Sequence, residues 1–84
     1  MKYCLVTFRS VTPAQRAERL LRKKGFDCTL RRTPRWMEEQ GCGYSVQVRS
    51  ADADSCVLLL RAEQIPFRKV YLQRENGVTE ELAL

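Results

Sequence analysis

The residue with the greatest chemical potential in this sequence is Cys42, which stands between Gly41 and Gly43. The two glycines carry no side chains, so they leave the sulfur uncovered and allow another backbone or a second sulfur to approach closely. A cysteine in a hydrophobic core is instead surrounded by larger side chains. An uncovered cysteine can react as a nucleophile in its thiolate form. The residues leave two interpretations: Cys42 carries out chemistry and its neighbours form the functional site, or Cys42 only opens a strand and fills a small gap.

Three arginines, Arg31, Arg32 and Arg35, precede Cys42. Nearby positive charge lowers the pKa of a cysteine from its usual value of about 8.5 and so favours the thiolate. Residues 33–40 are expected to form one or two helical turns, whose negative end opposes the thiolate by about 0.3–1 kcal/mol. A close arginine outweighs an effect of that size. The sequence leaves open which of the three arginines faces the sulfur.

Trp36 is the only tryptophan and lies in the same segment. Tryptophan is enriched in binding hot spots, so Trp36 is a candidate anchor for a partner protein. The alternative is that Trp36, beside Met37, covers the edge of the core. The sequence fits both interpretations.

The other three cysteines, Cys4, Cys28 and Cys56, lie in apolar or strand-like runs, which favours buried structural roles over disulfides. The sequence has no histidine and no Cys-x-x-Cys motif, so we expect no metal site. It also has no Gly-rich phosphate loop and no nucleophile elbow. The sequence therefore predicts a protein without a cofactor and without independent enzymatic activity.

The length and composition are those of a small globular protein. The 84 residues suffice for one domain, over residues 1–84, and 44% of them are hydrophobic, which argues against disorder. No apolar run approaches the roughly 20 residues needed to cross a bilayer, and residues 1–4 do not resemble a secretory leader. We therefore expect a cytoplasmic protein that does not bind membranes. The net charge of +5 favours acidic partners, including nucleic acids.

Two kinds of hydrophobic pattern alternate along the chain. Period-2 alternation and β-branched residues predict four strands, at residues 3–8, 26–31, 44–49 and 67–73. Apolar residues at helical spacing predict two helices, one with Thr12 as its N-cap and one capped by Ser50 or Asp52. Residues 75–84 are expected either to return as a short edge strand or to fray.

The order β-α-β-β-α-β predicts an α+β, ferredoxin-like fold, in which two helices cover one face of a four-stranded antiparallel sheet. The opposite face, which we call the open face, is expected to carry Tyr3, Leu5, Thr7 and Tyr71 without full cover from the chain. Such a face commonly serves as a dimer interface or as a ligand site.

One set of residues between positions 3 and 48 resembles a known family. The matching residues are Tyr3-x-x-x-Thr7-Phe8-x-Ser10, then Ala14, Glu18, Leu21 and Gly25, then Thr33-Pro34-Arg35 and Cys42-Gly43. This pattern resembles the DUF3343 family of small bacterial selenium/sulfur carrier-like proteins. By resemblance, Cys42 corresponds to the cysteine of the family's Cys-Gly and Arg35 to the arginine of its Pro-Arg. The sequence departs from the family at two places: Gly41 stands where a small polar residue is usual, and Arg31-Arg32 stand where apolar residues are usual. The second change puts charge close to the expected site, so the partner could differ.

The resemblance implies that Cys42 accepts sulfur or selenium as a persulfide or selenosulfide. The donor would be a protein such as a cysteine desulfurase, and an acceptor protein would receive the atom. Two alternatives remain: a basic nucleic-acid-binding module, and a non-enzymatic regulatory domain that forms homodimers through the open face. For RNA binding, the central strands offer Tyr3 or Phe8 and Tyr44, but the third strand lacks the Lys/Arg-Gly-aromatic signature.

Overall fold

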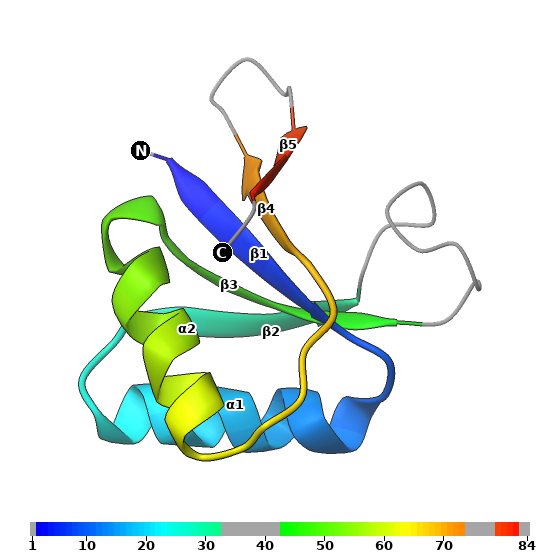
Figure 1. Cartoon of the computed structure of the whole chain (residues 1–84), viewed down its shortest axis with the longest axis vertical. Coiled ribbons are helices and arrows are strands. Elements are labelled where there is room, and N and C mark those ends of the chain that lie inside the picture. Colours follow the sequence, from blue (N-terminus) through cyan, green and yellow to red (C-terminus); the bar gives the residue numbers. More distant parts are fainter. Residues whose placement is uncertain (1, 33–42, 74–78, 83–84) are drawn as a thin grey trace.

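The structure, a computed structural model, describes residues 2–32, 43–73 and 79–82. It contains a five-stranded antiparallel sheet in the order β2-β3-β1-β4-β5 and two α-helices (Figure 1). The strands are β1 (Tyr3–Phe8), β2 (Cys28–Arg32), β3 (Tyr44–Arg49), β4 (Val70–Gln73) and β5 (Thr79–Leu82). The helices are α1 (Val11–Lys23) and α2 (Ala53–Ala62), and a short 3-10 helix, η2 (Ser50–Asp52), leads into α2.

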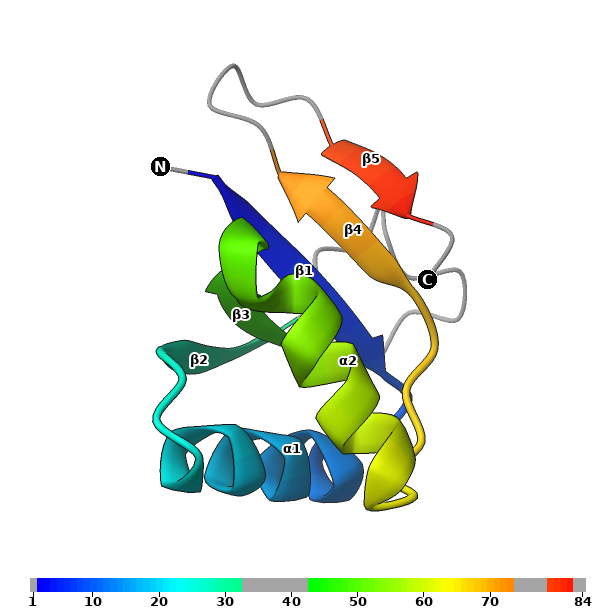
Figure 2. The same ribbon diagram turned by 60° about the vertical axis from the view of Figure 1, so that its left-hand side comes forward.

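The predicted α+β class is confirmed, but the predicted count of four strands is wrong. Strand β5 pairs with β4 in antiparallel register, with Val70 opposite Leu82 and Tyr71 opposite Glu81. Figure 2 shows β5 as the outermost strand beside β4. Of the two outcomes left open for the end of the chain, the described residues 79–82 therefore form the edge strand.

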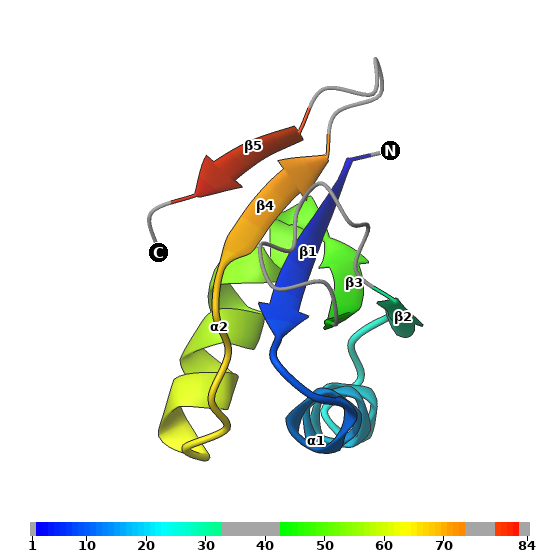
Figure 3. The same cartoon turned by 90° about the vertical axis from the view of Figure 1, so that its right-hand side faces the viewer.

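Both helices pack on one face of the sheet, because alternate strand residues there are apolar. Figure 3 looks along α1 and shows α2 running down the picture, and the buried residues of both helices belong to one core with those of β1 and β3. Strand β1 contributes Cys4, Val6 and Phe8 to this core, all at most 1% exposed. The helices contribute Ala14, Ala17, Leu21, Cys56, Val57 and Leu60. The core thus fixes which strand residues face the helices and which face away.

The two helices end in the same hydrogen-bonded motif. After α1, the N–H of Gly25 donates to the carbonyl of Arg22 at 3.0 Å, and that of Phe26 donates to Leu21 at 2.9 Å. Gly25 has φ = 89°, a left-handed conformation that glycine adopts without steric cost. Phe26 therefore belongs to the helix terminus, and β2 begins at Cys28, two residues later than predicted.

At its other end, α1 begins at Val11 with Ser10 as its N-cap. The predicted N-cap, Thr12, is therefore two residues too late and lies within the first turn. After α2, Gln64 repeats the motif of Gly25, with φ = 56° and an N–H that donates to Arg61 at 3.1 Å. The N–H of Ile65 completes this motif by donating to the carbonyl of Leu60 at 2.9 Å.

Strand β4 begins at Val70 and not at residue 67, because two residues there face a single residue of β1. The N–H of Thr7 donates to the carbonyl of Lys69 at 2.8 Å, and the N–H of Arg68 donates to the carbonyl of Thr7 at 2.7 Å. Two residues opposite one form a β-bulge, which bends a strand and redirects its side chains. Sequence alternation alone does not reveal this change of register.

The open face is less exposed than predicted at its centre. Leu5 and Thr7 are 5% and 3% exposed, and Ser45 of β3, opposite Thr7, is 1% exposed. Tyr3 and Tyr71 are half-buried. The prediction that this face lacks cover is therefore wrong for Leu5 and Thr7. Among the described residues, the exposed large apolar side chain is Leu58 of α2, away from this face.

Candidate functional site

The structure describes three of the seven predicted site residues. Cys42, Gly41, Arg35 and Trp36 lie outside the described residues, as does the helix expected at 33–40. Gly43, Arg31 and Arg32 lie at the end of the sheet where β2 finishes and β3 begins.

Gly43 links the predicted nucleophile to the core. It is buried and directly precedes Tyr44, the first residue of β3. Tyr44 lies opposite Arg32 on one side and opposite Phe8, the last residue of β1, on the other. The covalent bond between Cys42 and Gly43 thus joins the predicted site to the end of the sheet at which β1 and β2 both finish.

Arg31 and Arg32 are successive strand residues, so their side chains leave the sheet on opposite faces. The guanidinium of Arg31 donates to Oε1 of Gln47 at 2.7 Å. Arg31 itself lies opposite Ser45, so Gln47 is two residues farther from Gly43 along β3. The hydrogen bond therefore draws the charge of Arg31 away from the end of the sheet that carries Gly43. Arg32 is exposed, and its backbone lies directly opposite the residue that follows Gly43.

The three described cysteines are free thiols in the core, which confirms their predicted burial. Cys4 and Cys56 are 1% and 0% exposed, and Cys28 is 8% exposed. Burial raises the pKa of the Cys4 and Cys28 thiols, and it raises the pKa of Cys56 to about 12, with a smaller contribution from the charge of Asp52. A thiol with a raised pKa is protonated at neutral pH and is a poor nucleophile.

Within the described ranges, no group of three or more cysteine, aspartate or glutamate side chains could hold a metal ion. Neither described helix has the length and apolar character that a bilayer crossing requires.

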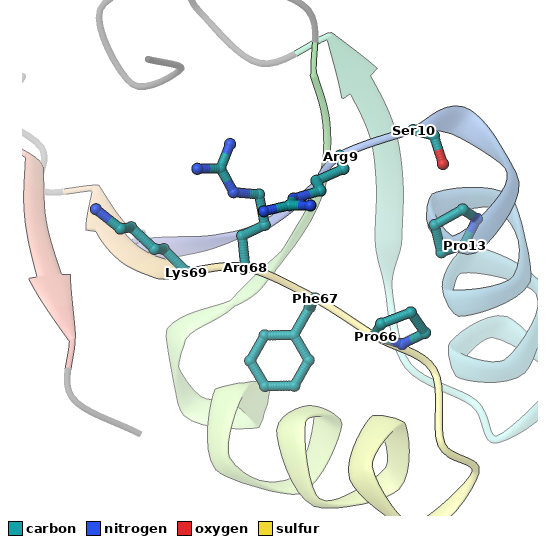
Figure 4. A pocket seen from close by; sticks show the side chains of 7 residues that line it. All are labelled: Arg9, Ser10, Pro13, Pro66, Phe67, Arg68 and Lys69. Carbon is teal, nitrogen blue, oxygen red and sulfur yellow. The ribbon is translucent and has the colours of Figure 1, made fainter. Parts of the chain in front are cut away.

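The structure also reveals a pocket that the sequence did not indicate, which we call the basic pocket. It has a volume of about 610 Å³ and lies between the end of β1, the start of α1 and the segment that precedes β4 (Figure 4). Its lining residues are Arg9, Ser10, Pro13, Pro66, Phe67, Arg68 and Lys69. The two groups of residues are more than 50 positions apart in the sequence, and only the pairing of β1 with the bulge brings them together. The one available signal was the Arg68-Lys69 pair beside a strand.

The aromatic residues considered for RNA binding do not form a stacking surface. Phe8 is fully buried against the helices, and Tyr44, directly opposite Phe8, packs against the same core. Only Tyr3 of the three lies on the opposite face, where it is half-buried. Base stacking on a sheet requires exposed aromatic rings on its central strands. The described part of the sheet does not present such a platform.

Comparison with known proteins gives one family match. A family model described as "Putative Se/S carrier protein-like" matches residues 3–72, from the start of β1 to the third residue of β4. No curated protein matches the chain. No solved structure matches it either.

Proposed function

Because this chain belongs to the "Putative Se/S carrier protein-like" family, we propose that it carries a sulfur or selenium atom on the sulfur of Cys42. One structural observation supports this choice of residue above the others. The three described cysteines are buried and have raised pKa values. Cys42 is the fourth cysteine of the chain, and its two glycine neighbours leave it open to a second sulfur.

The proposed reaction is an exchange between sulfur atoms. The Cys42 thiolate attacks the outer sulfur of a persulfide on a donor protein such as a cysteine desulfurase. A new S–S bond forms on Cys42, the S–S bond of the donor breaks, and the donor cysteine leaves as a thiolate. The electrons balance without an external oxidant or reductant. An acceptor protein then removes the atom by the same exchange, and selenium follows the same course as a selenosulfide.

The neighbouring residues have distinct proposed roles. Arg35 and Arg32 supply positive charge that favours the thiolate and the anionic outer sulfur. Arg31 contributes less, because its hydrogen bond to Gln47 holds the guanidinium away from the end of the sheet that carries Gly43. Gly41 and Gly43 keep the sulfur accessible, and Trp36 provides an apolar contact for the donor protein. A reducing compartment such as the cytoplasm would keep the carrier thiol free between cycles.

Mass spectrometry of the intact protein tests this proposal. After incubation with a cysteine desulfurase and cysteine, the protein should gain the mass of one sulfur atom, which a reductant should remove. Peptide mapping should place the atom on Cys42, and Cys42→Ser should abolish the gain. Cys28→Ala, which removes the least buried of the three core thiols, is the matched control and should still be loaded. Loading on Cys4, Cys28 or Cys56, or undiminished loading of Cys42→Ser, would refute the proposal.

A further inference from the structure

We propose that the basic pocket binds an anionic small molecule, in which a tetrahedral oxyanion such as a phosphate group is attached to an apolar or aromatic body. This inference goes beyond the carrier function, because it uses only described residues around the end of β1 and does not involve Cys42. The inference depends on three features of the pocket: the charged side chains that line it, the start of α1, and the apolar side chains on its remaining wall.

Two arginines from opposite ends of the sequence meet at this pocket. Arg9 directly follows β1, which ends at Phe8, and its side chain is exposed. The backbone of Arg68 is bonded to Thr7 at 2.7 Å within the bulge. Figure 4 shows the side chains of Arg9 and Arg68 on one side of the segment that precedes β4, whereas the Phe67 ring lies on the other side. Two guanidinium groups on one side suit an oxyanion, which accepts paired N–H donors from arginine.

The charges at the pocket have a positive balance. Within the described part of the chain, no carboxylate forms an ion pair with Arg9. Nζ of Lys69 lies 3.2 Å from Oε1 of Glu81 on β5, so this carboxylate offsets part of the positive charge. Both of these side chains are about half exposed, which weakens their mutual attraction. The described lining of the pocket therefore carries three cationic side chains, those of Arg9, Arg68 and Lys69, and no carboxylate.

The start of α1 adds to this positive potential. Ser10, the N-cap, makes no hydrogen bond from its side chain to the helix, and the first turn contains no acidic residue. The positive end of the helix dipole is consequently not offset by the helix's own side chains. Because Ser10 and Pro13 line the pocket, a bound anion would lie beside this end, a position that favours negative charge.

The remaining wall of the pocket is apolar and indicates a ligand larger than an inorganic ion. Pro13 and Pro66 line this side, together with Phe67, whose ring is turned into the core. The guanidinium carbon of Arg61 lies 5.8 Å from the centre of the Phe67 ring, and the ring packs against the core, so this wall is held in place. The volume of about 610 Å³ is within the usual range for organic ligands. We therefore assign the cationic side to the oxyanion and the apolar side to the body that carries it.

Titration of the full chain with phenyl phosphate, followed by amide NMR shifts, tests the proposal. Saturable shifts are expected at Arg9, Ser10, Arg68 and Lys69. Inorganic phosphate should bind more weakly, because it lacks the ring, and phenol should not produce saturable shifts. Arg9→Gln and Arg68→Gln should each weaken phenyl phosphate binding about tenfold, the usual value of one charged hydrogen bond. Glu81→Gln, which removes the competing carboxylate, should strengthen it.

Arg19→Gln provides the matched control, because it removes the same charge from an exposed position on α1. Arg19 is about 13 Å along the helix axis from Ser10, which exceeds the screening length of about 8 Å at physiological salt. Binding to Arg19→Gln and to Cys42→Ser should equal that of the unmodified chain. The sulfur-loading experiment and the phenyl phosphate titration are therefore independent, and either one can fail without affecting the other.

Three results would overturn the proposal. The first is the absence of saturable shifts at the pocket with phenyl phosphate. The second is equal weakening by Arg9→Gln and Arg19→Gln, which would show that only the overall charge matters. The third is equal affinity for inorganic phosphate and phenyl phosphate, which would exclude a role for the apolar wall. Arg68→Gln tests the proposal only if the bulge keeps its structure. Arg9→Gln does not depend on the bulge, because Arg9 is exposed and lies beyond the end of β1, so this variant tests the proposal in either case.

Discussion

The hydroxyl of Thr7 bonds to both backbone groups of Lys69. It accepts a hydrogen bond from the N–H at 3.0 Å and donates one to the carbonyl at 3.2 Å. The carbonyl of Thr7 already accepts a hydrogen bond from the N–H of Arg68, the first residue of the bulge. The hydroxyl of Thr7 is therefore the acceptor for the N–H of Lys69, the second residue of the bulge. This side chain thereby holds β4 against β1 where the bulge has displaced the regular ladder.

Thr7→Val should therefore destabilise the protein. Valine has the shape of threonine but cannot accept a hydrogen bond, so the N–H of Lys69 loses its partner beside a residue that is 3% exposed. We expect the free energy of unfolding to fall by about 1–3 kcal/mol in chemical denaturation. Thr29→Val, at an exposed position on β2, is the control and should change stability little. Equal effects of the two variants would show that the hydroxyl of Thr7 has no special role.

Gln64→Gly should stabilise the protein. Gln64 ends α2 with φ = 56°, a conformation that costs a residue with a side chain about 1 kcal/mol more than glycine. The free energy of unfolding should rise by roughly that amount, as measured by thermal and chemical denaturation. The reciprocal variant, Gly25→Ala, should lower stability by a similar amount. A Cβ at Gly25 would meet no atom within 4 Å, so its cost comes from the backbone conformation alone. A neutral or destabilising Gln64→Gly would contradict this account.

The buried thiol of Cys56 should make stability depend on pH in the alkaline range. Its pKa is raised from 9.0 to about 12 in the folded protein, so the unfolded chain loses the proton first as the pH rises. The protonated thiol contributes its full stabilisation below about pH 9 and loses it progressively between about pH 9 and about pH 12. Over this range the free energy of unfolding falls by at most about 1.4 kcal/mol per pH unit. The difference in unfolding free energy between the unmodified chain and Cys56→Ala should therefore shrink from about pH 8 to about pH 10.5. A constant difference would show that Cys56 does not titrate differently on unfolding.

Glu18 should protect the outer edge of β2. Its carboxylate accepts a hydrogen bond from the N–H of Leu30 at 2.9 Å and lies 3.5 Å from the guanidinium of Arg22, one turn later on α1. Glu18→Ala should lower the free energy of unfolding by about 1 kcal/mol, because the edge loses its partner. It should also increase concentration-dependent association, as measured by light scattering. Glu63→Ala, at the exposed C-cap of α2, should do neither.

The sequence predicted the parts of the fold that depend on local pattern. Strands β1 and β3 have the predicted bounds, because alternation is regular over residues 3–8 and 44–49. The termination of α1 followed from Gly25. These features depend on which residues can occupy a helix, a strand or a left-handed turn, and neighbouring residues largely decide that.

The features that sequence reasoning missed depend on residues far apart in the chain. The late start of β4 results from the bonds of Thr7 to Arg68 and Lys69. The basic pocket has the same origin, since Arg9 gains its companions only through this pairing. The burial of Ser45 was also missed, because alternation indicates which face a residue occupies and not what covers that face. Of the candidate site, the sequence placed Gly43 correctly before a strand, but it could not show that Arg31 is bonded to Gln47.

The way in which α1 covers β2 also limits how copies of this chain can assemble. The outward N–H of Leu30 and the outward carbonyl of Cys28 are bonded to Glu18 and Arg22, at 2.9 and 3.3 Å. A β-sheet that grows from molecule to molecule needs two available edges, one to receive a strand and one to offer. Among the described strands, β2 and β5 are the two edges of the sheet, and side chains of α1 bond to two of the outward backbone groups of β2. The side chains of α1 thus hinder a second copy of the chain from adding a strand at the β2 edge.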